Sequence, residues 1–526
     1  MSGNGPTDCA GLARRAAIGA ALLALPLWAL LYANAAALRS DWDLANLGTS
    51  RRYWDDLAVA VVNYQQGVGR LSAGETVGWR CGEVIAWLRQ SLPIAAHDAA
   101  VRGWQFWRTL PVHQFRHASP MRLRDSDDAG RSWFATWGFF ILGGIAPYLP
   151  LWLAVLLALP LFYWIMLEHL VAGNGPTGAV FLLLLALSAY TADLLTLPYS
   201  AVGFFLVSLL LVVALATYSL TAPRITPSGL LLRWLVGGIV FAVCVLCRRS
   251  CLTLAPALTV AAAIGAIRAS RGKKRPMGRA ALFTVGALML LLGPHLLVRP
   301  SAHHEEWVGI WEGLGDFDRE KGHAWDDDVA REALRREGYV VSGSVGPWWN
   351  AEMESIFRRL TLRDIATDPA WYAGILGRRL AATVLQLRLW PRQSVDGRSF
   401  ASHTRPNEGC IDVYYRLTHT ADWFGLGRRL VELPLVVLWM PLVTAAALGA
   451  IALLRRRSGR LVLAKGQLGI VGLVALAAAP LPILVTTASG PETQAFTLVH
   501  LLLAGVLVEA VVRAVSRAVD RRSAPA

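Results

Sequence analysis

Long apolar runs alternate with polar segments along much of the chain. About ten runs are close to the roughly 20 residues that a helix needs to cross a bilayer: 16–38, 146–167, 177–197, 201–221, 230–247, 251–268, 280–298, 431–454, 467–488 and 494–514. The apolar, glycine-rich stretch 133–144 is too short to cross and is interpreted as an interfacial or re-entrant helix. The pattern predicts an all-α polytopic membrane protein with about ten transmembrane helices.

Basic residues predict the orientation of these runs. Lys and Arg cluster before the first run and after the sixth, eighth and tenth, within Arg14–Arg15, Arg268–Arg279, Arg455–Arg460 and Arg513–Arg522. Ten spans place all four clusters on one side, and the excess of Lys and Arg marks the cytoplasmic side. We therefore expect a multi-pass protein of the inner (plasma) membrane with both termini in the cytoplasm. The first run is long enough to be a retained signal anchor.

This orientation puts two long segments outside the membrane. The predicted parts are 1–38 (cytoplasmic tail and first span), 39–145 (first external loop with interfacial helices), 146–298 (transmembrane bundle), 299–430 (second external loop) and 431–526 (C-terminal spans and cytoplasmic tail). Both loops are rich in aromatic residues and are expected to fold as helices. In the second loop, Asp326, Asp327 and Asp328 are expected to start a solvated helix carrying Val329, Ala330 and Leu334.

Composition supports a membrane protein and limits its partners. The chain is 55% hydrophobic and contains 21 Trp residues, a combination typical of polytopic membrane proteins. Its net charge of +15 would suit nucleic acid, but the basic residues lie mainly between apolar runs. Membrane lipid is therefore the expected partner, and nucleic acid is not. The sequence contains neither a P-loop nor the set of kinase motifs, and this lack of a nucleotide-hydrolysing motif argues against an ATP-driven pump.

Two acidic pairs just beyond the first run are the candidate catalytic residues: Asp41, Asp43, Asp55 and Asp56. A carboxylate at a membrane face can act as a general base on an acceptor hydroxyl or amine. No cofactor is certain, and a divalent cation held against a pyrophosphate is the alternative use of these carboxylates. Ordinary capping of helix N-termini would also explain acidic residues at such positions.

The short turn between the fifth and sixth runs carries Arg248 and Arg249 on the predicted outer side. Two arginines in so short an external hairpin run against the positive-inside bias. Guanidinium groups suit bidentate contacts with phosphate oxygens. The pair is therefore interpreted as binding the phosphate of a lipid carrier, with snorkelling to lipid headgroups as the alternative.

Three further residues are candidates for contact with substrate. His303 and His304 open the second external loop, and Glu492 lies between the ninth and tenth runs. The HHEE sequence lacks the His-x-x-x-His spacing that places two imidazoles on one helix face, so no metal site is predicted. Ionisable groups near the membrane are functional candidates by default, although Glu492 also fits an ordinary turn.

Several features together resemble the GT-C superfamily of membrane glycosyltransferases, which includes protein O-mannosyltransferases and lipid A aminoarabinose transferases. The acidic stretch Arg52–Ala58 follows the first run and is similar to the acidic-x-x-Tyr-x-x-x-Ala segment of that family. Paired runs in Gly237–Pro256 flank a short turn with arginines, and GLGDF, GHAWDDDVA and ATDPAWY lie in the large loop before the last runs. Here the tyrosine precedes the acids, which leaves open which of the four aspartates matches the catalytic acid.

The resemblance implies an inverting transfer of a sugar from a polyprenyl-phosphate donor on the extracytoplasmic face. An external Asp would deprotonate a glycan, lipid or protein acceptor, while Arg248 and Arg249 neutralise the departing phosphate. The activated sugar–phosphate bond would supply the energy. A transporter or flippase for lipid-linked oligosaccharides and an O-antigen-ligase-like transferase are the alternatives.

Overall fold

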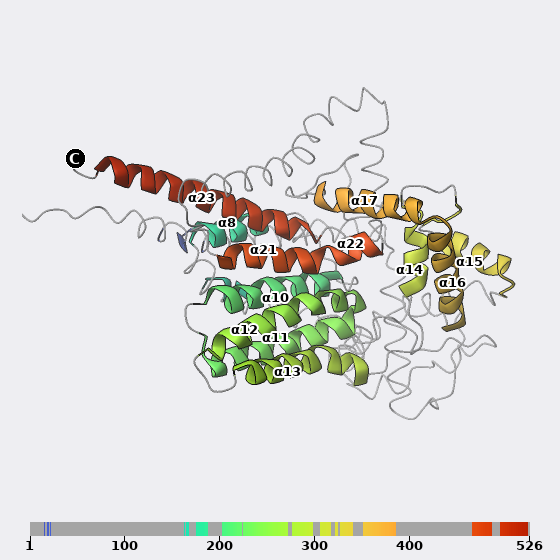
Figure 1. The fold of residues 1–526 in the computed structure, drawn as a ribbon, viewed down its shortest axis with the longest axis horizontal. Helices are drawn as coiled ribbons and strands as arrows, with labels where there is room; N and C mark the ends of the chain where they lie inside the picture. The colour runs from blue at the N-terminus through green and yellow to red at the C-terminus, as the bar shows by residue number, and fades with distance from the viewer. Residues whose placement is uncertain are drawn as a thin grey trace, which may run out of the picture.

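The computed structural model describes residues 175–187, 202–222, 225–271, 276–297, 306–316, 321–324, 327–339, 351–385, 465–485 and 495–523, with a few positions between 15 and 167. This part is helical and holds no strand. Its helices are α8 (Pro176–Leu187), α10 (Val202–Thr221), α11 (Pro227–Cys247), η4 (Arg249–Leu254), α12 (Ala255–Ala269), α13 (Pro276–Leu297), α14 (Glu306–Gly313), α15 (Asp327–Arg336), α16 (Ala351–Thr367), α17 (Pro369–Leu385), α21 (Lys465–Ala478), α22 (Pro480–Leu484) and α23 (Thr497–Ser523) (Figure 1).

Five helical segments are long and apolar enough to cross a membrane: Phe204–Thr221, Pro227–Cys247, Arg249–Ala269, Pro276–Gly293 and Gly466–Leu484. Helices α8 and α23 contribute shorter apolar segments. Together they coincide with the third to seventh, ninth and tenth predicted runs and support the prediction of an all-α membrane protein. The other predicted runs lie outside the described residues apart from a few positions. The total of ten spans and their orientation therefore stay predictions.

Local sequence determines where α11 and α12 begin and end. The Thr226 side chain accepts a hydrogen bond from the Gly229 N–H at 3.1 Å, and Pro227 occupies the first turn. Helix α11 stops because Arg248 is extended, with φ −153° and ψ 106°. A 3-10 turn follows, and Pro256 lies in the first turn of α12. The result is a tight hairpin with the two arginines at its tip.

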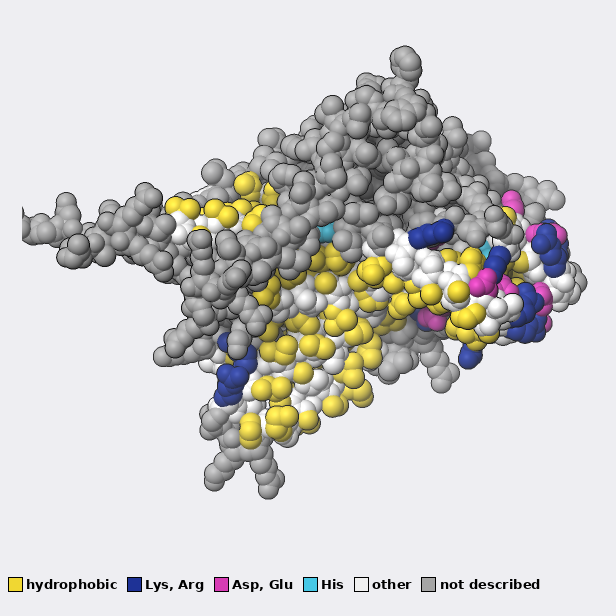
Figure 2. All heavy atoms as spheres, turned by 45° about the horizontal axis from the view of Figure 1, so that its top comes forward, with side chains coloured by type: hydrophobic (Ala, Val, Ile, Leu, Met, Phe, Trp, Pro, Cys, Tyr) yellow, Lys and Arg dark blue, Asp and Glu magenta, His cyan; other side chains and the backbone are white. Residues whose placement is uncertain are grey.

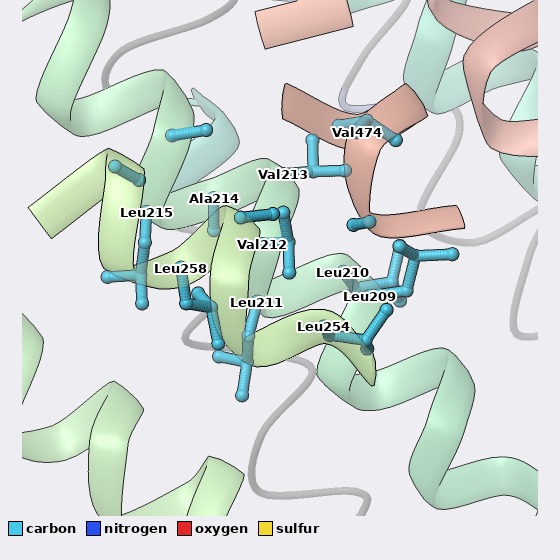
Figure 3. Close-up of a cluster of buried hydrophobic side chains, with 14 of the residues drawn as sticks. Leu209, Leu210, Leu211, Val212, Val213, Ala214, Leu215, Leu254, Leu258 and Val474 are labelled. Atoms are coloured by element: carbon cyan, nitrogen blue, oxygen red, sulfur yellow. The ribbon is translucent and has the colours of Figure 1, made fainter. Parts of the chain in front are cut away.

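Helix α10 is the centre of the bundle. In its membrane-length segment, 89% of residues are buried. It packs against α11, α12 and α21, and Figure 3 shows Leu209–Leu215 beside Leu254, Leu258 and Val474. Helices can approach closely in a membrane where small residues meet. Consistent with this, a Cβ on Gly265 of α12 would lie 2.9 Å from the Ser219 hydroxyl of α10.

Helices α11 and α13 form the outer face of this bundle. Only 17% of the membrane-length segment of α13 is buried, and Leu282 is 76% exposed. Leu231 and Leu235 of α11 are also exposed, and Figure 2 shows hydrophobic side chains spread over the bundle. A soluble protein rarely exposes so large an apolar surface. This face is suited to contact with lipid tails.

Helices α14 to α17 gather at one end of the bundle (Figure 1). Helix α14 packs on α16, while α17 packs on α22 at the end of a membrane-length segment. A second small core joins α14, α15 and α16: Val308, Trp311, Ala330, Leu334, Met353, Ile356, Phe357 and Leu360. The predicted helix after Asp326 is confirmed as α15, with Ala330 and Leu334 buried. We call α14–α17 the appended helices.

Candidate functional site

Among the residues predicted from sequence to act in catalysis or binding, the structure describes only Arg248 and Arg249. The predicted catalytic residues Asp41, Asp43, Asp55 and Asp56 lie outside the described residues. The same holds for His303, His304 and Glu492. The site can therefore be built from the arginine turn and from what the fold brings to it.

The arginine turn is held by backbone hydrogen bonds on both sides. The Arg248 N–H donates to the Cys244 carbonyl at 2.7 Å, and the Arg248 carbonyl accepts from the Cys251 N–H at 3.1 Å. Cys247 and Cys251, which flank the turn, are fully buried in the bundle core. This anchoring fixes the backbone from which the Arg249 side chain extends.

Arg249 joins the bundle to the appended helices. Its Nη2 lies 2.5 Å from Oε1 of Glu306, the first residue of α14. The Arg249 side chain is 20% exposed and that of Glu306 is 56% exposed. Within the described part of the chain, Nε and Nη1 of Arg249 are buried without a hydrogen-bond partner. Two N–H-bearing nitrogens of this guanidinium thus lack a hydrogen-bond acceptor among the described residues.

A second glutamate, and not Glu306, holds the N-terminus of α14. Glu354 of α16 is buried, and its carboxylate accepts the Trp307 N–H at 2.8 Å and the Val308 N–H at 3.4 Å. Such a contact satisfies N–H groups that lack partners within the helix and complements the helix dipole. Glu306 is therefore positioned beside Arg249 without being needed to cap its own helix.

A buried ion pair fixes the appended helices to α22. Arg379 Nε of α17 lies 3.0 Å from Asp316 Oδ2, and both side chains are fully buried. Nη1 of Arg379 also donates to the Ile483 carbonyl in α22 at 3.2 Å. Since α22 packs against η4 as well as α17, this contact helps to set the position of α14–α17 relative to the arginine turn.

His323 is a further buried polar group beside the appended helices. Its ring lies 4.8 Å from Trp311 and 5.8 Å from Trp371, measured between ring centroids. Its Nε2 lies 3.2 Å from Asp364 Oδ2. Burial lowers the pKa of His323 below its ordinary value of 6.5, although the Asp364 carboxylate opposes the shift. His323 is 1% exposed and so acts as part of this small core.

A salt bridge beside Trp371 is more exposed to solvent than the Arg379–Asp316 pair. Lys321 Nζ lies 2.9 Å from Asp368 Oδ2 and 4.1 Å from the Trp371 ring centroid. Asp368 also accepts the Trp371 N–H at 3.0 Å and so caps α17. The hydrogen bond from Lys321 lowers the pKa of Asp368. An aromatic ring with adjacent charges is a surface that a sugar or a lipid headgroup can contact.

Far from the arginine turn, a carboxylate is buried between three helices of the bundle. Glu509 of α23 accepts a hydrogen bond from Gln467 Nε2 at 2.6 Å and from the hydroxyl of Thr177. The Thr177 N–H lies 3.4 Å from the same oxygen. Glu509 is 1% exposed. It ties α8, α21 and α23 together at the first turns of α8 and α21.

Only weak sequence patterns indicate the functional residues that the sequence analysis missed. In α17, Ile375, Arg379 and Thr383 share one face at i, i+4 and i+8, and all three are buried. An arginine between two inward-facing positions indicates a buried partner. Glu306 and Glu354 gave no such signal, since acidic residues near helix starts are common. Their pairing depends on contacts between distant segments.

The arrangement places a guanidinium with two buried nitrogens that lack acceptors where the apolar bundle meets the appended helices. Among the described residues, no group of three or more His, Cys, Asp or Glu side chains is arranged to hold a metal ion. Comparison of the chain with protein families, curated proteins and solved structures found no match.

Proposed function

We propose that the protein is a membrane glycosyltransferase that moves a sugar from a polyprenyl-phosphate donor to an acceptor at the end of the bundle that carries the appended helices. One observation carries the proposal. Arg249 lies where the bundle meets these helices, and its buried Nε and Nη1 have no partner among the described residues. A guanidinium at the end of a lipid-facing bundle suits a ligand with a lipid tail and a phosphate head.

In the proposed reaction, the donor's lipid tail lies along the apolar bundle and its phosphate contacts Arg249. The acceptor hydroxyl loses its proton to a carboxylate, which the sequence assigns to one of Asp41, Asp43, Asp55 and Asp56. The acceptor oxygen then bonds to the anomeric carbon as the bond from that carbon to the phosphate oxygen breaks. Polyprenyl phosphate leaves with the electron pair, and Arg249 stabilises its growing negative charge.

The test is transfer by the purified full-length protein in proteoliposomes supplied with a labelled polyprenyl-phosphate sugar and a membrane extract as acceptor. Arg249→Ala should lower kcat/KM by about 100-fold or more, as expected when a group that stabilises the departing charge is lost. Arg271→Ala is the matched control, because Arg271 is exposed and follows α12 at the opposite end of that helix from η4. If Arg249→Ala and Arg271→Ala had equal activity, Arg249 would not be the group that binds the donor phosphate.

A transporter of lipid-linked oligosaccharides is the second candidate, and Glu509 favours it. Ionisable groups buried within membrane bundles often mark transport pathways. The same proteoliposomes discriminate between the two functions. Movement of a labelled lipid-linked glycan across the bilayer, without any change in its linkage, would favour transport. A new sugar–acceptor bond would favour the transferase.

A further inference from the structure

In the described part of the chain, the appended helices are attached to the bundle by a buried polar contact and by an exposed one. At α17, neither side chain of the Arg379–Asp316 ion pair is exposed, and Arg379 also reaches the Ile483 carbonyl of α22. At α14, the Arg249–Glu306 ion pair is open to solvent, since the Glu306 side chain is 56% exposed. Breaking a buried ion pair leaves charges without water, whereas an exposed pair contributes little free energy. The contact at Glu306 is therefore the one that a ligand can break.

The exposed contact occupies the part of Arg249 that a phosphate needs. A guanidinium contacts two phosphate oxygens through its Nε–Nη2 edge or its Nη1–Nη2 edge, and both edges contain Nη2. Glu306 Oε1 lies 2.5 Å from Nη2. A phosphate on either edge therefore lies beside the Glu306 carboxylate, and two anions at that separation repel each other. This repulsion favours rotation of Glu306 away from the turn.

We propose that Glu306 is an internal competitor for the phosphate site, so that a phosphate bound at Arg249 releases α14 from the η4 turn. The inference rests on the proposed function, because it takes Arg249 as the phosphate-binding group, and it adds how that site is regulated. Displacing Glu306 has the same cost for every phosphate. Glu306 therefore weakens the binding of phosphate monoesters and diesters by the same factor and creates no preference between them.

Release leaves the rest of the appended helices folded. The N-terminus of α14 keeps its capping contacts, because the Glu354 carboxylate accepts the Trp307 and Val308 N–H groups. The second small core still joins α14, α15 and α16, and the Arg379–Asp316 pair still holds the turn after α14 to α17. Helices α14–α16 can thus move together away from η4, with the attachment at α22 as the fixed point.

Phosphate binding and release of α14 are linked in both directions. An exposed ion pair changes an equilibrium constant by up to about fivefold, which corresponds to about 1 kcal/mol. If Glu306 weakens phosphate binding by a given factor, bound phosphate must weaken the contact of α14 with η4 by the same factor. Two independent measurements should therefore give the same number.

The first measurement is binding to the full-length protein in dodecyl maltoside micelles at about pH 8, where a monoester carries two charges because its second pKa is about 6. Citronellyl phosphate, its methyl ester and inorganic phosphate are titrated separately by isothermal titration calorimetry, and circular dichroism reports folding. Glu306→Gln and Glu306→Ala should tighten binding of all three ligands by the same factor, about two- to fivefold. Glu332→Gln should have no effect, since Glu332 is an exposed, ion-paired glutamate on α15.

The second measurement is amide hydrogen exchange, followed by mass spectrometry in the same micelles. Citronellyl phosphate should speed exchange in α14 of the wild-type protein by about two- to fivefold and leave exchange in α17 unchanged. Glu306→Ala should show the faster exchange of α14 without ligand, and the ligand should add nothing. Arg249→Ala should also show it without ligand and should bind all three phosphates more weakly.

The results separate this inference from the proposed function. Unchanged phosphate affinity in folded Glu306→Gln and Glu306→Ala overturns the role of Glu306 and leaves the transferase proposal in place. A gain in affinity that is larger for citronellyl phosphate than for its methyl ester also overturns release, because only a Glu306 that stays beside the ligand repels the dianion more. The expected affinities and exchange without any sugar transfer by the wild-type protein support release and count against the transferase. Inorganic phosphate that binds as tightly as citronellyl phosphate supports release by a free phosphate and counts against a lipid-linked donor.

Discussion

Arg379 and Asp316 form an ion pair in which neither side chain is exposed, and the same guanidinium reaches the Ile483 carbonyl. The pair joins α17 to the turn after α14, and the third contact joins both to α22. Helix α22 follows Ala479, where Pro480 starts a new short helix after α21. The appended helices are thus fixed to the end of a membrane-length segment by a buried ion pair and a part-buried hydrogen bond.

Replacing Arg379 with Leu should lower the free energy of unfolding by about 3–5 kcal/mol, because the Asp316 charge would stay buried without this partner. Thermal unfolding of the protein in detergent measures the change. Arg378→Leu is the control, since the Arg378 side chain is exposed on the same helix. The double variant Asp316→Leu, Arg379→Leu should lose less than the sum of the two single variants. Additive losses would contradict a direct interaction.

His323 should make stability depend on pH in a definite direction. Its folded-state pKa lies below 6.5, so the unfolded chain binds the proton more readily than the folded one. The stabilising contribution is present above pH 6.5 and is lost as pH falls below that value. Melting temperatures between about pH 5 and pH 7.5, a range above the titration of most carboxyl groups, should fall toward the acid side in the wild-type protein.

In His323→Gln the same series of melting temperatures should be flatter, because the titrating group is gone. His500→Gln serves as the control, since His500 is a second buried histidine, which lies in α23 with its ring against Phe496. An equal acid-dependent loss in wild type and His323→Gln would show that other groups cause it.

Glu509 should stabilise the packing of α8, α21 and α23. Glu509→Ala removes the acceptor of the shortest hydrogen bonds from the Gln467 amide and the Thr177 hydroxyl, which keep only contacts of 3.3 Å to Thr177 Oγ1 and to the Gly505 carbonyl. The expected loss of stability is about 1–3 kcal/mol in total. Glu509→Gln retains a side-chain oxygen and should cost less. Unfolding in mixed micelles of increasing SDS content measures both, with Val508→Ala at an exposed neighbouring position as control. Equal stability of Glu509→Ala and wild type would contradict the role of this carboxylate.

Gly505 should be required where α23 meets α8. A Cβ at this position would lie 2.5 Å from the Thr177 carbonyl oxygen, which is a backbone atom and cannot rotate away. Gly505→Ala should therefore destabilise the protein by about 1–3 kcal/mol, the usual cost of overpacking. A Cβ on Gly472 of α21 would meet nothing within 4 Å, so Gly472→Ala should be neutral or slightly stabilising. The difference between their melting temperatures is the measurement.

The sequence predicted the apolar helices better than their ends. The run 280–298 indicated α13, but the helix begins at Pro276, because helix formation extends past the apolar residues to a proline that suits a first turn. Likewise, α23 continues to Ser523 through a basic segment. Hydropathy reports where a helix can lie in lipid, whereas its length depends on backbone hydrogen bonds and capping.

The candidate site was predicted only in part. Arg249 was predicted to bind phosphate because arginines are unusual in a short external hairpin. That prediction did not require knowing which residue Arg249 contacts. Its contact with Glu306 spans 57 positions of the chain, and the pair Arg379–Asp316 spans 63. Contacts of this kind depend on how helices pack in three dimensions, which periodicity along a single chain does not specify.

The near-complete burial of α10 has a consequence for how the protein assembles. Because this helix is apolar on every side, it can enter a bilayer alone and be stable there in contact with acyl chains. In the folded protein, those acyl chains are exchanged for α11, α12 and α21. Substitutions in its middle should therefore leave insertion by the translocation machinery unchanged and impair the later association of helices, a step governed by close packing.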